Sequence, residues 1–248
     1  MTPILSIDNL TKHYKNGEKN VLNGLTFSVN PGEIYGFLGP NGAGKSTTIK
    51  ILSGLIPSDG GNITVLGKNL HDYREQLKRC IGVVPQEIAV FPTLTAYENL
   101  IVFGGIYGLQ TRHLYKRIRY LLKLFGLDEH RNKKVELYSG GMKRRINIIV
   151  GMLHEPSLLL LDEPTVGIDV QSKNVIIENL KMLNGKGTTI LYTSHDMDEA
   201  QQFCTKVGII DEGQIIKEGT PEELINQFPC YTNLESVYLK LTGKKLRD

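Results

Sequence analysis

A glycine-rich segment near the N-terminus has the residues and the spacing needed to hold phosphate groups. Residues 39–46 read Gly-Pro-Asn-Gly-Ala-Gly-Lys-Ser and match G-x-x-x-x-G-K-[ST], a pattern that chance produces in about one such sequence in a hundred. Glycines let backbone N–H groups approach phosphate oxygens, because no Cβ stands in the way. The segment follows an expected strand, residues 34–38, and opens an expected helix, residues 46–53. We therefore expect Lys45 to reach the β- and γ-phosphates of a nucleotide and Ser46 to bind Mg²⁺.

Two carboxylates end an uninterrupted run of leucines. Leu158–Leu161 is followed directly by Asp162 and Glu163. Such a run is typical of a strand covered on both faces of a parallel sheet, where charge is costly unless a cation is present. We expect Asp162 to hold Mg²⁺ and Glu163 to orient the attacking water as a general base. The alternative is that the acidic pair only caps the following turn.

Two more polar residues follow expected strands. Gln86 comes after the run 81–84, and His195 comes after another apolar run. Ligands of open α/β sheets bind just outside the carboxyl ends of the strands. Gly39 and Asp162 also lie at strand ends. We therefore expect the ends of four strands to lie at the same edge of the sheet, around one nucleotide. A neutral His195 could then hydrogen-bond near the γ-phosphate.

A second helix start with accessible N–H groups lies at residues 138–145, Tyr-Ser-Gly-Gly-Met-Lys-Arg-Arg. Ser139 is a good N-cap, and Gly140 and Gly141 leave the first N–H groups open. One ATP does not need two anion-binding helix starts from the same molecule. The sequence therefore favours two copies arranged head to tail, each placing its Ser-Gly-Gly on the nucleotide of the other. Taken alone, the segment is also a common helix cap.

Over nearly its whole length the chain resembles the ATP-binding subunit of ABC transporters. The resemblance implies a Walker A loop at 39–47, a Q-loop at Gln86, a signature at 138–142, a Walker B strand at 158–163 and a switch histidine, His195. It implies catalytic roles for Lys45, Glu163 and His195 and a Mg²⁺ site on Ser46, Gln86 and Asp162. The implied ATP-binding residues are Tyr14, Gly39, Pro40, Asn41, Gly42, Ala43, Gly44, Lys45, Ser46, Thr47, Gln86, Ser139, Gly140, Gly141 and, in the D-loop, Asp169. Tyr14 stands where the family has an aromatic residue stacked on adenine.

The signature departs from the family's commonest form, Leu-Ser-Gly-Gly-Gln. Tyr138 and Met142 stand at its two ends, and the thioether of Met142 cannot make the hydrogen bonds of a glutamine. The form Ser-Gly-Gly-Met-Lys-Arg-Arg is similar to subunits that work with ABC-2-type permeases, which are usually exporters. Residues 103–109 and 234–243 are similar to the same group.

The expected fold class is α/β, a P-loop NTPase core with a central, mainly parallel sheet. An N-terminal antiparallel β subdomain and an inserted α-helical subdomain complete it. We expect one nucleotide-binding domain at 4–235, with the helical and signature subdomain at about 87–156 and a short tail at 236–248. The expected strands are 4–10, 25–29, 34–38, 63–65, 81–84, 158–161 and 189–192. The expected helices lie at 46–53, within 95–126, from 139 through 150, from Pro221 to Pro229, and at 234–241.

Composition excludes several other classes. The chain has 248 residues, a net charge of +3 and 40% apolar residues, which indicates a globular protein without the concentrated basic charge of most nucleic-acid binders. No run of 18 uncharged apolar residues occurs, and Asp8 interrupts any secretory signal pattern. Three cysteines (Cys80, Cys204 and Cys230) without C-x-x-C spacing are expected to be free thiols of a cytosolic protein.

The resemblance implies partners as well. It predicts a separate transmembrane permease, a homodimer or heterodimer of ATP-binding subunits, a peripheral place on the cytoplasmic face of the cell membrane, and no nucleic acid. Residues 87–107 are expected to face the permease through the apolar side chains Val90, Phe91, Leu94 and Tyr97, unless these pack internally.

Two alternatives stay open at this point: a soluble ABC-type ATPase acting on nucleic acid or the ribosome, and a P-loop kinase. The first would usually carry coiled coils, zinc insertions or a second ATPase unit, which the sequence does not show. The second is less compatible with Glu163, which favours water as the phosphate acceptor.

Overall fold

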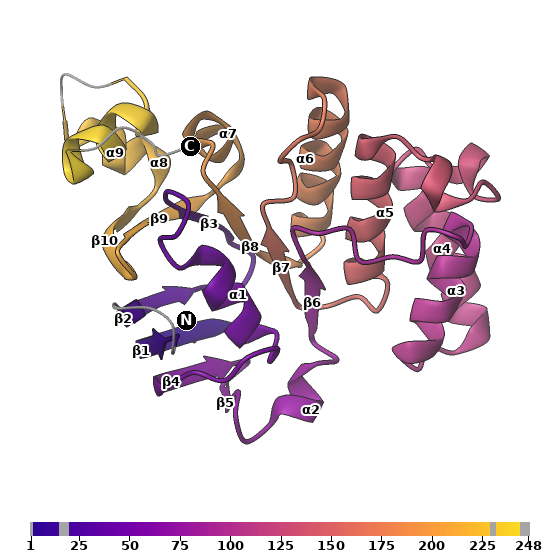
Figure 1. Cartoon of the computed structure of the whole chain (residues 1–248), viewed down its shortest axis with the longest axis horizontal. Helices are drawn as coiled ribbons and strands as arrows, with labels where there is room; N and C mark the ends of the chain where they lie inside the picture. Colours follow the sequence, from indigo (N-terminus) through magenta and orange to yellow (C-terminus); the bar gives the residue numbers. More distant parts are fainter. Residues whose placement is uncertain (1, 15–19, 229–231, 244–248) are drawn as a thin grey trace. The chain divides into compact units, whose positions relative to one another are not determined.

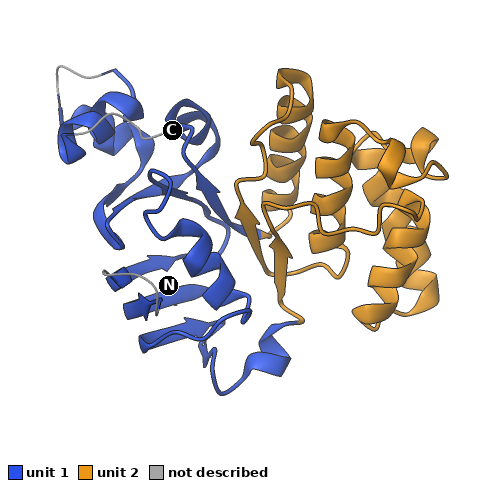
Figure 2. Ribbon diagram, in the orientation of Figure 1, with its two compact units in different colours: residues 1–78, 189–248 blue, residues 79–188 orange. Residues whose placement is uncertain are grey.

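A computed structural model describes residues 2–14, 20–228 and 232–243, and its contacts divide the chain into two compact units (Figure 1, Figure 2). Unit 1 comprises residues 1–78 and 189–248, and unit 2 comprises residues 79–188. Within the described part of the chain, no helix is both long and apolar enough to cross a bilayer. Cys80 is a free thiol as expected, and Cys204 is buried. Cys230 lies outside the described residues.

The N-terminal half of unit 1 forms the expected antiparallel sheet, in the order β2-β1-β4-β5. Its strands are β1 (Leu5–His13), β2 (Asn20–Val29), β4 (Gly60–Val65) and β5 (Lys68–Asn69). β1 and β2 are longer than the expected 4–10 and 25–29, because their polar ends pair with each other as well. Leu5 lies between Val29 and Val65 in the register, so three apolar side chains share one buried position.

A second sheet of unit 1 contains the strands that lead to the phosphate-binding segment. Its strands are β3 (Ile34–Leu38), β8 (Thr189–Ser194), β9 (Lys206–Asp211) and β10 (Gln214–Gly219). β3 is buried along its whole length and runs parallel to β8 on one side and β9 on the other. Phe27 of β2 stacks on Tyr35 and Phe37 of β3, with ring centroids 5.2 and 5.1 Å apart, and so packs the two sheets together.

The β9–β10 hairpin was not among the expected strands. Its two-residue turn, Glu212-Gly213, has φ angles of 46° and 78°, which is the twist preferred by tight hairpins and accounts for the glycine. Gly213 also accepts a hydrogen bond at its carbonyl from the N–H of Asn23 in β2, 3.1 Å away. The turn signal between two apolar runs could have predicted this hairpin.

Five helices are described in unit 1. They are α1 (Lys45–Leu52), α2 (Arg74–Leu77), α7 (Met197–Phe203), α8 (Pro221–Asn226) and α9 (Leu234–Thr242). α8 begins at Pro221 as expected, with a capping box between Thr220 and Glu223. It ends at Asn226, while the expected stop at Pro229 lies outside the described residues. α9 confirms the helix expected at 234–241.

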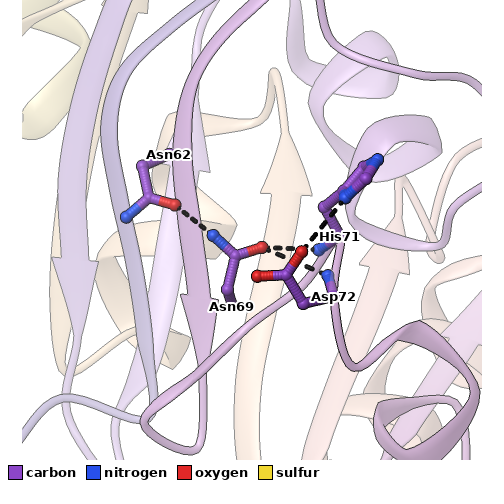
Figure 3. A network of polar contacts seen from close by, with 4 residues as sticks. All are labelled: Asn62, Asn69, His71 and Asp72. Carbon is purple, nitrogen blue, oxygen red and sulfur yellow. Dashed lines mark hydrogen bonds and ion pairs between the residues drawn. The ribbon is translucent and has the colours of Figure 1, made fainter.

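A polar network closes the connection from β5 to α2 (Figure 3). The Asn69 amide donates to Asn62 Oδ1 at 2.6 Å, and Asn69 Oδ1 accepts from the N–H groups of His71 and Asp72 at 2.9 and 3.3 Å. Asn69 thereby satisfies backbone donors that the turn leaves unpaired. The network shapes a surface turn, and none of its members was an expected functional residue.

Unit 2 contains two parallel strands and most of the long helices. The strands are β6 (Ile81–Val84) and β7 (Leu158–Asp162). The helices are α3 (Ala96–Ile106), α4 (Thr111–Leu124), α5 (Gly140–Met152) and α6 (Val170–Asn184), with short 3₁₀ turns η1 (Asp128–His130) and η2 (Val135–Leu137). The inserted helices and the strand at 81–84 are confirmed, whereas α6 was not predicted.

Candidate functional site

The segment 39–46 leaves β3 and turns into α1 in unit 1. Gly39 follows Leu38, the last residue of β3, and its N–H donates to Ser194 O of β8 at 3.3 Å. A Cβ at Gly39 would collide with the backbone oxygen of Ile210. Gly44 has φ 108°, and a Cβ there would lie 2.6 Å from Leu22 Cδ2. The loop geometry therefore requires glycine at both positions.

Lys45 lies buried against its own loop. Its side chain is 5% exposed, and Nζ donates to the carbonyl oxygens of Gly39 at 2.7 Å and Pro40 at 3.1 Å. Ala43 donates its N–H to Pro40 O at 3.2 Å and tightens the turn. Asn41 and Gly42 are exposed, whereas Ser46 and Thr47 are half-buried. An ammonium group, a helix start and a turn rich in N–H groups therefore meet at one place, which fits a phosphate group.

His195 and Gly39 follow neighbouring strands at the same edge of the unit 1 sheet. β3 and β8 run parallel with Leu38 opposite Ser194, so the next residue of each strand leaves the sheet at the same level. This is the arrangement expected from the sequence for these two residues.

Tyr14 lies beside the start of α1. Its hydroxyl is 3.5 Å from Thr47 Oγ1, and the side chain is 40% exposed. The strand end before it is held by Asp59, which accepts from Lys12 Nζ at 2.8 Å and from the His13 N–H at 2.6 Å. These bonds, the one from Lys12 first, hold the pKa of Asp59 below its usual range. The role of Asp59 was missed because its partners lie 46 and 47 residues away in the chain.

The carboxylate pair of unit 2 lies at the end of a fully buried strand. All five residues of β7 are buried, and Asp162 and Glu163 are 5% and 6% exposed. Val84 of β6 pairs with Leu161 of β7. Beyond these strand ends, the Gln86 amide donates to Glu163 Oε2 at 3.4 Å. The structure therefore brings Gln86 and Glu163 together.

Two residues of α5 hold the segment that carries Gln86, and sequence reasoning missed both. Buried Asn147 donates to the carbonyl oxygens of Pro85 and Glu87 at 3.2 and 3.3 Å and accepts from the Ala89 N–H at 3.0 Å. Arg144 donates to Pro85 O at 3.2 Å. Burial lowers the pKa of Arg144, and the negative charge of Asp162 partly offsets this. A buried polar residue within the apolar run 146–150 was the available signal.

The Ser-Gly-Gly segment begins α5, as expected. Ser139 is the N-cap, and its Oγ accepts from the Met142 N–H at 3.3 Å. Ser139 and Gly140 are exposed, and a Cβ at Gly140 would meet nothing within 4 Å. A Cβ at Gly141, by contrast, would collide with Ser172 of α6. Packing within the chain therefore explains Gly141 but not Gly140.

Tyr138, at one end of the signature, and Asp169 have structural roles in this unit. Tyr138 is buried and donates its hydroxyl to His130 O at 2.8 Å, which explains an aromatic residue at this position. Asp169 caps α6 by accepting from the Ser172 N–H at 2.8 Å, and this bond lowers its pKa. Since Gly141 abuts Ser172, the start of α5 and the start of α6 lie together.

Comparison with known proteins agrees with this geometry. The family model described as "ABC transporter" matches residues 22–166. The linearmycin resistance ATP-binding protein LnrL of Bacillus subtilis (strain 168) is 50% identical over 224 residues, which cover 90% of this chain and 71% of that protein. The chain belongs to the ABC transporter family. The Nod factor export ATP-binding protein I of Ralstonia nicotianae is 41% identical, over 90% of this chain and 69% of its own length.

Solved structures of the family have the same fold. An ATP-binding subunit of an ABC transporter superposes with a TM-score of 0.87 at 32% identity, over 96% of this chain and 99% of its own. A dimeric ATP-binding cassette in a post-hydrolysis state, bound to ADP and phosphate, has a TM-score of 0.79 at 28% identity, over 87% and 98%.

The family assignment confirms the expected fold class and activity. This ABC protein is an ATP-binding subunit of an ABC transporter, and its reaction is the hydrolysis of ATP. A further solved relative, cbiO1 of Clostridium perfringens, is part of the ABC transporter complex cbiONQ and superposes with a TM-score of 0.81 at 29% identity, over 92% of each chain. The alternative reading as an ATPase acting on nucleic acid or the ribosome is not favoured by these relatives.

Proposed function

We propose that this subunit powers export through a separate permease by ATP-driven closure of two subunits arranged head to tail. The observation that carries the proposal is Gly140, which is exposed, has open space where a Cβ would be, and has no internal reason to be glycine. Glycine at a helix start permits close approach of an anion to backbone N–H groups. A phosphate held by the 39–46 loop of a second subunit fits that surface.

Each residue of the site then has a defined task. Lys45 and the N–H groups of residues 39–47 bind the β- and γ-phosphates, and Tyr14 stacks on the adenine. Glu163 accepts a proton from the attacking water, and His195 hydrogen-bonds at the γ-phosphate. Ser139 and Gly140 bind the triphosphate held by the other subunit.

The oxygen donors Ser46, Gln86 and Asp162 suit Mg²⁺, which prefers oxygen ligands. The buried carboxylate of Asp162 supports this choice, because a cation offsets the cost of burying its charge. When bound, Mg²⁺ neutralises charge on the β- and γ-phosphate oxygens. We assign the domain as 4–235, with a helical and signature subdomain at about 87–156.

Export as the direction of transport rests on the relatives. The two named above are, by their names, a linearmycin resistance protein and a Nod factor export protein. We place the subunit at the cytoplasmic face of the membrane as a peripheral protein, because it hydrolyses ATP to drive a permease. The dimer can be formed by two identical chains or by this chain and a related one.

An exposed apolar surface in unit 2 suits the permease. Phe91 is 47% exposed, and Ile88, Val102 and Ile106 are 38%, 38% and 69% exposed. Val90, Leu94 and Tyr97, which we expected to share in this contact, are only partly exposed. Asn99 holds the Phe91 backbone by accepting from its N–H at 2.8 Å and donating to its carbonyl at 3.0 Å. Phe91 contacts Phe103 of α3 with ring centroids 5.8 Å apart, and Val102 and Ile106 lie one turn apart on that helix. Exposed apolar side chains close to one another are typical of a protein interface.

Replacement of Phe91 tests this assignment. Phe91→Glu should abolish co-purification of the permease after mild detergent extraction, because a charge would be buried in the contact. Hydrolysis by the isolated subunit should stay at the wild-type rate. The matched control is Met182→Glu, which changes a residue 49% exposed on α6. Equal recovery of the permease with both variants would refute the assignment of this surface.

A further inference from the structure

One face of α4 concentrates positive charge without any acidic residue. Helix Thr111–Leu124 has no Asp or Glu, and its exposed cations are Arg112, Lys116, Arg119 and Lys123. Their spacing of three and four residues places all four within about 60° of the helix circumference. From first to last they extend about 16 Å along the helix. The opposite face is apolar and buried inside unit 2 through Leu114, Ile118, Leu121 and Leu122.

The fifth cation of α4 is already paired and does not belong to this face. Arg117 is partly buried, its guanidinium lies 3.4 Å from the Glu155 carboxylate, and it donates to Met152 O at 3.1 Å. His113 lies 3.1 Å from the same carboxylate. Glu155 thus offsets positive charge on the side of α4 that faces the end of α5. That side differs from the stripe formed by Arg112, Lys116, Arg119 and Lys123.

Hollows beside the stripe could receive small anionic groups. A cavity of about 470 Å³ is lined by Arg119, Tyr97, Tyr115, Arg131 and Asn132 among others. Its one carboxylate, Asp128, pairs with Arg131 at 3.1 Å, so Arg119 leaves the hollow with a net positive charge. A second hollow of about 390 Å³ is lined by Tyr115, Lys116, Arg119, Tyr120 and Lys123 alone.

Tyrosines border the stripe and extend it. Tyr115 is 49% exposed and Tyr120 is 36% exposed. Lys186 of unit 2 donates to the Tyr120 hydroxyl at 2.6 Å and lies 4.7 Å from its ring centroid. This places a further exposed cation at the edge of the same surface.

We propose that this surface, formed by Arg112, Tyr115, Lys116, Arg119, Tyr120, Lys123 and Lys186, binds the phosphate groups of anionic phospholipids at the membrane. The proposal rests on the proposed function, which brings the subunit to a membrane. Lysine and arginine near an anionic leaflet are attracted to it, and tyrosines favour the interface. A net charge of only +3 is less suited to nucleic acid. The stripe orients the subunit on the bilayer, while the permease supplies the main attachment.

Flotation of the full-length subunit with vesicles tests the proposal. We expect binding to phosphatidylcholine vesicles that contain phosphatidylglycerol, loss of binding at high salt, and no binding to phosphatidylcholine alone. Each removed cation should weaken the binding about fivefold, so the variant with Arg112, Lys116, Arg119 and Lys123 all changed to Gln should not float. The control changes four exposed cations elsewhere to Gln: Lys68, Arg79, Lys181 and Lys240.

The outcomes separate this proposal from the proposed function. Equal flotation of the two quadruple variants, or tighter binding of the wild type to a DNA duplex than to the vesicles, would overturn the lipid surface. Loss of the permease in detergent by the quadruple variant of the α4 cations would also overturn it, because these cations would then bind protein. Thermal unfolding and ATP hydrolysis should match the wild type in both quadruple variants. The wild type could also float with the vesicles but neither dimerise in the presence of ATP nor bind a permease. In that case the proposed function fails, while the assignment of the lipid-binding surface still stands.

Discussion

The backbone of Glu163 is in the left-handed region, with φ 46°. This conformation costs a residue with a side chain about 1–2 kcal/mol. Its carboxylate is nevertheless buried and accepts a hydrogen bond from Gln86. A strained backbone that holds one buried carboxylate is typical of a functional position. At the residue scale, this strain supports the proposed role of Glu163 as the base.

Replacement of Glu163 tests that role. Glu163→Gln should lower the rate of phosphate release about 10²–10⁴-fold, because the amide cannot accept the proton of the attacking water. Binding of ATP should change little, since the amide has the size of the carboxylate and the 39–46 loop is untouched. Hydrolysis and nucleotide binding are measured on the same preparation, with exposed Glu222→Gln as the control. Turnover at the wild-type rate by Glu163→Gln would show that Glu163 is not the general base.

At the scale of elements, α5 connects two parts of unit 2. Its N-terminus carries Ser139 and Gly140, and its middle holds the segment around Gln86 through Asn147. A displacement of the helix would therefore act on the Gln86 segment through the three hydrogen bonds of Asn147 and the one from Arg144. Contact of the helix start with a second subunit could in this way reach the residues that precede Phe91.

The Asn147 contacts predict a measurable loss. Asn147→Leu keeps the volume but removes all three bonds, which should lower the free energy of unfolding by about 1–3 kcal/mol. ATP hydrolysis should fall as well, because Gln86 is no longer fixed beside Glu163. Urea unfolding and steady-state hydrolysis measure the two effects, with exposed Asn174→Leu of α6 as the control. An Asn147→Leu variant as stable and as active as Asn174→Leu would contradict this account.

Helix caps make the stability of the elements depend on pH. The Thr95 N–H lowers the pKa of Glu98 in the capping box of α3, and the Ser172 N–H lowers the pKa of Asp169 at α6. The unfolded chain binds protons at about pH 4, before the folded state does. The stabilisation is therefore complete above that pH and is lost as the pH falls through the folded values.

The midpoint temperature of thermal unfolding, measured at pH values from about 6 to 3, should decrease as the pH is lowered. Glu98→Gln should make this dependence shallower, because one of the carboxyls with a lowered pKa is gone. Exposed Glu222→Gln should keep the wild-type dependence. A midpoint that stays constant or rises on acidification would show that these caps do not have the assigned effect.

At the scale of the whole molecule, the sequence predicted the elements whose signal is local. The strands at 34–38 and 81–84 have the expected bounds, and the helix after Ser139 begins where expected. α6 was not predicted, although Asp169 caps it and Ile176, Leu180 and Leu183 form its buried face. α7 has only seven residues, too few for a clear helical period.

The roles of Asp59 and Asn147, which position other residues, could not be predicted from local sequence patterns. Asp59 fixes the strand before Tyr14 through residues far away in the chain, and Asn147 contacts a segment about 60 residues earlier. Neither residue type at either place has a distinctive spacing. Only the tertiary structure shows what these side chains hold, whereas the phosphate-binding motif is readable because its ligands are consecutive in the sequence.

The central claim is that one ATP is held by the 39–46 loop of one subunit and the Ser139 helix start of the other. Two inactive variants test it most directly when mixed. Lys45→Ala removes the phosphate-binding ammonium, and Ser139→Arg blocks the helix start. In a mixed dimer, one site contains both changes and the other contains neither.

Hydrolysis is measured for each variant alone and for an equimolar mixture. The account predicts that each variant alone is inactive and that the mixture recovers up to about a quarter of the wild-type rate, since half of the dimers are mixed and each has one intact site. A mixture no more active than the two variants measured separately would contradict the shared site.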